Sequence, residues 1–192
     1  MFALTPGPLG RHLASRKTAE IAASHGTPSS PELYRWRLDG RLSDLVALRF
    51  DMDDDEACRF GLACGGAAAT MAGQASFDCH LRGVIWRYGL ADLFQDVGSG
   101  RHHQAIKPTG YDYDADAVIP KAMARWRANY RALPEPHQMM AATIVWLYRG
   151  GLDTVWLRRV AVAWSSAHAI EVLRKDGALA DWGLLIALYP GW

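Results

Sequence analysis

The C-terminal stretch AWSSAHAIEVLRKDGALADWG, residues 163–183, restricts the fold more than any other part of the sequence. Within it, HAIEVL alternates apolar β-branched residues with a glutamate, which is the pattern of a strand with one buried face. Asp176 and Gly177 follow, and such a pair favours a two-residue hairpin turn because both turn positions need positive φ. The stretch therefore predicts a strand, a turn and a returning strand.

The chain before this stretch has the spacing of amphipathic helices. Helices are predicted within residues 42–50, 51–73, 77–94, 115–133 and 134–149, the last stopped by two glycines. The fold class that follows is α+β, with a helical N-terminal two-thirds packed on a small antiparallel sheet formed by the C-terminal part. Residues 1–30 mix Pro, Gly, Ser and Thr and predict a flexible N-terminal arm, which leaves 31–192 as a single α+β domain.

Charge and cysteine content narrow the function classes. Lys plus Arg number 21 and Asp plus Glu 20, so a net charge of +1 gives no global field typical of nucleic-acid or membrane binders. Three cysteines are too few for a disulfide scaffold and are expected to be free thiols. No apolar run is long enough to cross a bilayer. We expect no membrane partner and a cytoplasmic protein, or one exported without a cleavable signal peptide.

The acidic run DMDDDE superficially resembles a calcium loop, since Asp51, Asp53 and Asp55 stand at alternating positions. Glu56 occupies the place of the glycine that such a loop needs, and Leu62 that of its bidentate carboxylate. Acidic residues at a helix start, where they cap free N–H groups, explain the run better. No metal or other cofactor is expected.

Four residues predict thiol chemistry. Cys79 precedes a predicted helix, whose first-turn N–H groups would favour the thiolate. His168 opens the first strand of the predicted hairpin and Asp181 lies in the second, within reach of a carboxylate–imidazole bond that would leave the other ring nitrogen free as a base. Gln74 would donate its amide to the oxyanion formed when the thiolate attacks a carbonyl.

A cysteine in a DC context at a helix start, a later HAIEV strand and an aspartate in LADW together resemble the papain-like thiol enzymes, in particular their transglutaminase-like and NlpC/P60 branches. The resemblance implies Cys79 as nucleophile, His168 as base and Asp181 as orienting residue, with Gln74 as a weaker carry-over. It implies a hydrolase or acyltransferase that acts on peptide, isopeptide or glutamine amides of a protein or peptide substrate, without a cofactor.

Other residues compete for these roles. Cys64 is a second candidate nucleophile, although the Ala and Gly around it suit close helix packing. His102 and His103 are candidate bases for Cys79, or would bind an anion with Arg101. The spacing of the three cysteines matches no established zinc site.

DNA binding is the alternative function. Residues 148–175 resemble the helix-turn-helix of sigma-like and phage antiterminator proteins, with LRRVA in the first helix and a Trp-Ser turn before the second. Nucleic acid is expected as a partner only under this interpretation. The residues expected to contact phosphates are Arg158, Arg159, Arg174 and Lys175. Those expected to lie near base edges are Ser165, Ser166 and His168. A third hypothesis is an interaction module without chemistry, which Trp192 would help to dock.

Overall fold

The computed structural model describes residues 39–66, 73–98, 100–160 and 162–191, apart from the side chains of residues 73–75 and 103. The chain divides into two units, 1–32 and 33–192, and every described residue belongs to the second. The predicted arm, residues 1–30, and the predicted docking residue Trp192 lie outside the described residues.

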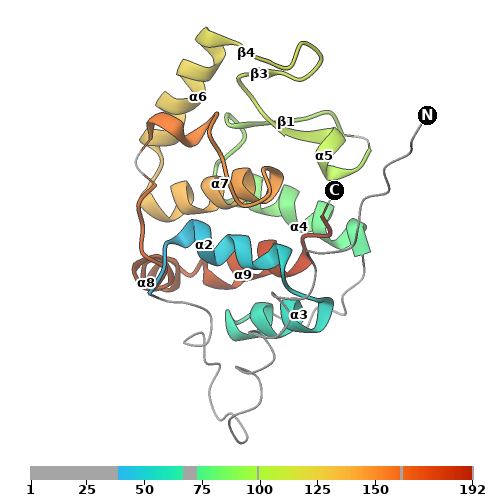
Figure 1. Cartoon of the computed structure of the whole chain (residues 1–192), viewed down its shortest axis with the longest axis vertical. Helices are drawn as coiled ribbons and strands as arrows, with labels where there is room; N and C mark the ends of the chain where they lie inside the picture. The colour runs from blue at the N-terminus through green and yellow to red at the C-terminus, as the bar shows by residue number, and fades with distance from the viewer. Residues whose placement is uncertain (1–38, 67–72, 99, 161, 192) are drawn as a thin grey trace, which may run out of the picture. The chain divides into compact units, whose positions relative to one another are not determined.

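The elements of the second unit are drawn in Figure 1. In chain order they are α2 (Leu42–Ala47), η2 (Leu48–Phe50), α3 (Asp54–Ala63), α4 (Gly73–Arg87), β1 (Phe94–Asp96), α5 (His102–Ala105), β2 (Ile106–Pro108), β3 (Tyr111–Asp112), β4 (Ala117–Val118), α6 (Pro120–Ala132), α7 (Glu135–Tyr148), η3 (Leu157–Arg159), α8 (Ser166–Asp176) and α9 (Leu179–Leu188). None of the helices in this described part is long and apolar enough to cross a membrane.

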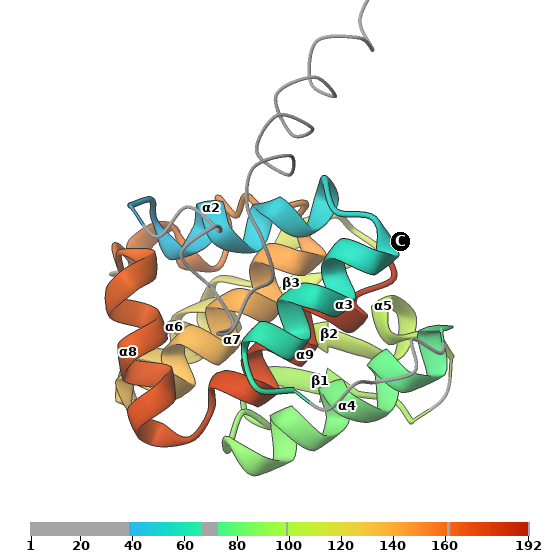
Figure 2. The same cartoon turned by 90° about the horizontal axis from the view of Figure 1, so that it is seen from below.

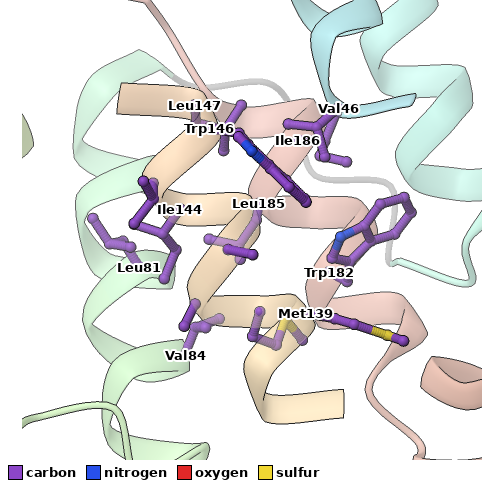
Figure 3. Close-up of a cluster of buried hydrophobic side chains, with 14 of the residues drawn as sticks. Val46, Leu81, Val84, Met139, Ile144, Trp146, Leu147, Trp182, Leu185 and Ile186 are labelled. Carbon is purple, nitrogen blue, oxygen red and sulfur yellow. The ribbon is translucent and has the colours of Figure 1, made fainter. Parts of the chain in front are cut away.

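Helix α7 forms the centre of this unit. Its residues 139–148 are all buried, as expected for a helix that is apolar on every side. Helices α2, α6, α8 and α9 pack against it, and Figures 1 and 2 show it enclosed by its neighbours. In Figure 3, Ile144 of α7 lies beside Leu81 of α4. The predictions of helices within 115–133 and 134–149 are confirmed by α6 and α7.

The α+β class is confirmed, but the predicted position of the sheet is wrong. Strands β1 and β2 pair antiparallel, with Phe94 opposite Pro108, and β3 and β4 form a second antiparallel pair. Both pairs lie in the middle of the chain, within residues 94–118, mostly between the helices predicted within 77–94 and 115–133, and β4 falls where the second of these helices was predicted to begin. The C-terminal part is helical, so the helices do not pack on a C-terminal sheet.

The C-terminal stretch is helical because its burial has a helical period. Ser166, Ala169, Ile170 and Leu173 are the buried residues of α8, which is the spacing of one helix face rather than of one strand face. The Ser165 side chain caps the helix by accepting from the backbone N–H of residue 168. The predicted hairpin is therefore wrong.

Gly177 explains why the hairpin signal was misleading. It has a φ of 77° and ends α8 as a left-handed cap. A helix C-cap and a two-residue hairpin turn both need a residue with positive φ, so an Asp-Gly pair serves either structure. The three alternating residues before it were too few to decide between them.

The acidic run caps a helix, as predicted. The Asp53 side chain accepts from the backbone N–H of Glu56 at 2.8 Å, and the Glu56 side chain accepts from the Asp53 N–H at 3.3 Å. This reciprocal pair satisfies two of the N–H groups that the start of α3 leaves free. The carboxylates of the run therefore stabilise a helix end.

Helices α3 and α9 cross at close range. A Cβ added to Gly183 of α9 would lie 2.2 Å from Cys64 Cβ and 2.7 Å from its Sγ, and one added to Gly61 of α3 would lie 3.0 Å from Ala187 Cβ. Figure 2 shows the two helices side by side. Gly61 and Gly66, on either side of Cys64, thus serve helix packing as the sequence predicted, whereas residues 67–69 lie outside the described residues.

Candidate functional site

Cys79, the predicted nucleophile, is an exposed residue of α4. The helix begins at Gly73, so Cys79 lies well inside it, and the prediction of a cysteine at the helix start is wrong. Residues 74–76, which separate two of the predicted helices, are themselves helical, and this moves the first-turn N–H groups away from Cys79. The side chain of Gln74, predicted to bind the oxyanion, lies outside the described residues.

His168, the predicted base, lies in the first turns of α8 and not on a strand. Its Nε2 is 3.1 Å from Glu135 Oε1, and the Trp164 indole N–H donates to the same oxygen at 2.9 Å. About half of each side chain in this His168–Glu135 pair is exposed. Glu135 begins α7, so the pair links the start of α8 to the start of α7.

Asp181, the predicted orienting residue, lies in the first turn of α9. Its Oδ2 accepts from the Tyr88 hydroxyl at 2.7 Å and from the Arg87 guanidinium. Burial, and then the hydrogen bond to Asp181, raise the pKa of Tyr88. Among the described residues, the hydrogen bonds of these two predicted triad members go to other partners, and no bond joins Asp181 to His168.

Two of the rival residues, Cys64 and His102, lie in the core. Cys64 is buried against α9, and burial raises the pKa of its thiol to about 12, which keeps it protonated. His102 is also buried, with Nδ1 3.1 Å from Asp78 Oδ1 and its ring against the edge of Phe77. The His103 side chain is outside the described residues. In the described ranges no three His, Cys, Asp or Glu side chains are grouped to hold a metal ion.

The predicted helix-turn-helix is formed only in part. Helix α8 occupies the place of its second helix, whereas the first is reduced to the single turn η3. Of the residues predicted to meet phosphates, Arg158, Arg159 and Arg174 are exposed, and Lys175 forms a 2.6 Å ion pair with Glu171. The described residues 148–160 and 162–175 therefore do not form the pair of helices that a helix-turn-helix needs.

Arginines of two elements gather beside η3. The Arg127 guanidinium, from α6, donates to the backbone oxygen of Trp156 at 3.1 Å and to that of Val155 at 2.5 Å. One turn later on α6, Arg131 donates to the backbone oxygen of Arg159 at 2.7 Å. These bonds hold the turn that carries Arg158 and Arg159 against α6. We call Arg127, Arg131, Arg158 and Arg159 the arginine cluster.

The charges of the arginine cluster are only weakly offset by carboxylates. Among the described residues none of its members forms an ion pair. The pKa of Arg127 is lowered, first by burial and then by the positive charges of Arg159 and Arg131. Asp153 is the acidic residue that acts on Arg127, and its carboxylate also accepts from the backbone N–H groups of Val155 and Leu157. The cluster is thus a local positive field.

The sequence contains a signal for this site that our predictions did not use. Helix α6 carries Lys121, Arg125, Arg127 and Arg131 and has no acidic residue, although the whole chain is nearly neutral. Basic residues without acidic i, i+4 partners repel one another along a helix. Such a helix in a neutral chain indicates a surface that binds anions.

Comparison with known proteins adds no family to these observations. No protein-family model, no curated protein and no solved structure matches the chain. The resemblance to papain-like thiol enzymes therefore stays a prediction, and the function is inferred from the geometry of the arginine cluster.

Proposed function

We propose that the protein binds nucleic acid through the arginine cluster. The observation that carries this proposal is the gathering of four arginines from α6 and η3 without an ion-paired carboxylate among the described residues. Like charges held this close cost folding free energy in the free protein. Phosphates that bind there remove the repulsion and release condensed counterions, which is the main source of affinity in nucleic-acid binding.

The chemistry of the cluster favours a chain of phosphates over a single anion. Arginine presents planar donor pairs that match phosphate oxygens, whereas lysine acts as a point charge. Two further exposed basic residues of α6, Lys121 and Arg125, lie on another flank of the helix from Arg127 and Arg131. The distance from Lys121 to Arg131 is about 15 Å along the helix axis, so a strand that crosses α6 can contact both groups with successive phosphates.

This proposal keeps one part of the helix-turn-helix hypothesis and replaces another. It keeps Arg158 and Arg159 as phosphate contacts. It replaces a recognition helix in the major groove with a surface formed by α6 and η3, which would position the phosphate backbone without reading duplex sequence. Binding is then expected to depend on salt and only weakly on duplex sequence.

The test compares two single variants, one that removes a charge from the arginine cluster and one that removes a charge elsewhere. A fluorescently labelled single strand of about 12 nucleotides is titrated with the protein and followed by anisotropy. We expect Arg158→Ala to raise the dissociation constant about fivefold, equivalent to about 1 kcal/mol. The matched control is Arg59→Ala, which removes an exposed arginine from α3 and should leave the constant unchanged. Equal effects of the two substitutions would contradict a localised site.

Thiol chemistry at Cys79 remains a separate prediction from the sequence. It has one supporting feature, an exposed thiol. The residues expected to assist it, His168 and Asp181, are engaged with Glu135 and with Arg87 and Tyr88. The arginine cluster therefore supports a binding function better than these residues support an amide hydrolase or acyltransferase.

A further inference from the structure

A hollow opens on the flank of α6 that faces away from Arg127 and Arg131. It has a cavity volume of about 190 Å³ and is open to solvent. The lining residues come from the turn after α4 and from the last turn of α6, and are Gly89, Asp92, Leu93, Asn129, Ala132 and Leu133. Asn129 lies two residues from each arginine, and two residues turn an α-helix by about 200°, so the arginines and the hollow lie on opposite flanks of α6.

The hollow has an apolar base and a fixed wall. Leu93 is buried, and its backbone oxygen accepts from the Trp126 indole N–H and from the backbone N–H of Thr109, both at 2.9 Å. Two bonds to one carbonyl hold this wall in place before any ligand arrives. A recess that is formed before binding, with apolar and polar groups both on its lining, is a form that small-molecule and base sites take.

Two polar side chains at the edge of the hollow are available to a ligand. Asp92 is exposed and Asn129 is half-buried, and neither side chain forms a hydrogen bond to another residue of the described ranges. An ionised carboxylate can only accept hydrogen bonds, whereas an amide both donates and accepts. Together they match a ligand edge on which an amino group stands next to an acceptor.

We propose that this hollow binds an amino-bearing nucleobase, such as cytosine, of a single strand whose phosphates lie on the arginine cluster. The inference rests on the proposed function. Asp92 accepts from the exocyclic amino group, as acidic side chains do from cytosine N4, and Asn129 donates to a neighbouring ring acceptor. Uracil and thymine present an oxygen at the same place, which leaves the carboxylate without a donor and disfavours them.

The geometry requires the strand to be single. In a duplex the amino group of a base is hydrogen-bonded to the partner base. Only an unstacked base can place its hydrogen-bonding edge in a recess. A strand that reaches from the cluster to the hollow crosses α6, which is about 10–12 Å across, a span of a few nucleotides. The exposed Lys121 and Arg125 lie on this helix and would meet the intervening phosphates.

The test compares two strands that differ at the proposed contact. Single strands of deoxycytidine and of deoxyuridine, each about 12 nucleotides long, are titrated with the protein by fluorescence anisotropy. We expect the deoxycytidine strand to bind about tenfold more tightly, which lies within the discrimination of one good base contact. Asp92→Asn and Asn129→Ala are each expected to reduce this ratio to about twofold or less.

The controls separate base recognition from charge. Asp114→Asn removes one exposed carboxylate from the turn between β3 and β4, so it matches the charge change of Asp92→Asn and should keep the wild-type ratio. Equal affinities of the wild type for the two strands, or an unchanged ratio in both hollow variants, would overturn the base site and leave the proposed function standing. Failure to bind either strand would overturn both.

Discussion

Replacing Gly183 with alanine is expected to lower the free energy of unfolding by about 3 kcal/mol, the upper part of the range for an overpacked core. The new methyl carbon would lie 2.2 Å from Cys64 Cβ and 2.7 Å from its Sγ. Both atoms are buried between α3 and α9, so relief requires the two helices to separate. Urea denaturation followed by circular dichroism measures the loss.

Two controls show whether the crossing of α3 and α9 is the cause. Gly83→Ala, on α4, places a methyl group where nothing lies within 4 Å, and it should stabilise the protein by up to about 1 kcal/mol because alanine is the better helix former. Cys64→Gly removes both close atoms and leaves the Cα of residue 64 at 3.7 Å. In that background, Gly183→Ala should lower the free energy of unfolding much less than it does in the wild-type protein. An equal cost in both backgrounds would contradict the close crossing.

Binding a single strand is expected to stabilise the wild-type protein against heat, and removal of the arginine cluster should abolish this effect. At about 100 times its dissociation constant, a strand adds about 2.7 kcal/mol to the folded state. For a domain of this size that free energy corresponds to a rise of about 8 °C in Tm. The measurement is a thermal melt at low salt, with and without a deoxycytidine strand.

The variant for this melt is Arg131→Ala, Arg158→Ala and Arg159→Ala combined. All three side chains are exposed, so the variant should fold, and its own melt without the strand reports whether it does. Loss of like charges and loss of the Arg131 bond to the Arg159 oxygen act on its Tm in opposite directions, so the Tm without the strand should change little, with no further rise when the strand is added. Arg59→Ala serves as the control and should show the full rise. A rise in the triple variant equal to that of the wild type would place the site elsewhere.

The helices at the centre of the fold could be predicted because their signals are local. Helix α7 has an apolar run, a proline near its start and two glycines after its end, and the structure places it at Glu135–Tyr148. The Asp53 and Glu56 cap is equally local, since its two members are three residues apart. Such features do not depend on what the helix packs against.

The C-terminal stretch could not be assigned because its signals suit two structures. Ile170 and Val172 alternate like a strand, yet Ile170 also belongs to the buried face of a helix with Ala169 and Leu173. The burial that decides between them comes from α7, α9 and α2, which pack against α8. Tertiary packing therefore determined the structure, because the alternating segment that favours a strand is only three residues long.

Half of the arginine cluster was visible in the sequence. Arg158 and Arg159 were predicted to meet phosphates, but next to a helix that the structure replaces with the turn η3. Arg127 and Arg131 belong to the site only because they donate to backbone oxygens of Val155, Trp156 and Arg159, about 28 residues further along the chain. No periodicity in the sequence indicates which backbone oxygens will accept hydrogen bonds from a surface arginine.

The most direct test of the central claim is the salt dependence of binding by the wild-type protein. If the arginine cluster neutralises about four phosphates of a single strand, a plot of log K against log salt concentration has a slope of about −2.8. The affinity then falls about 50-fold between about 50 and 200 mM salt. A slope near zero, or the absence of binding at the lower salt concentration, would contradict nucleic-acid binding by this surface.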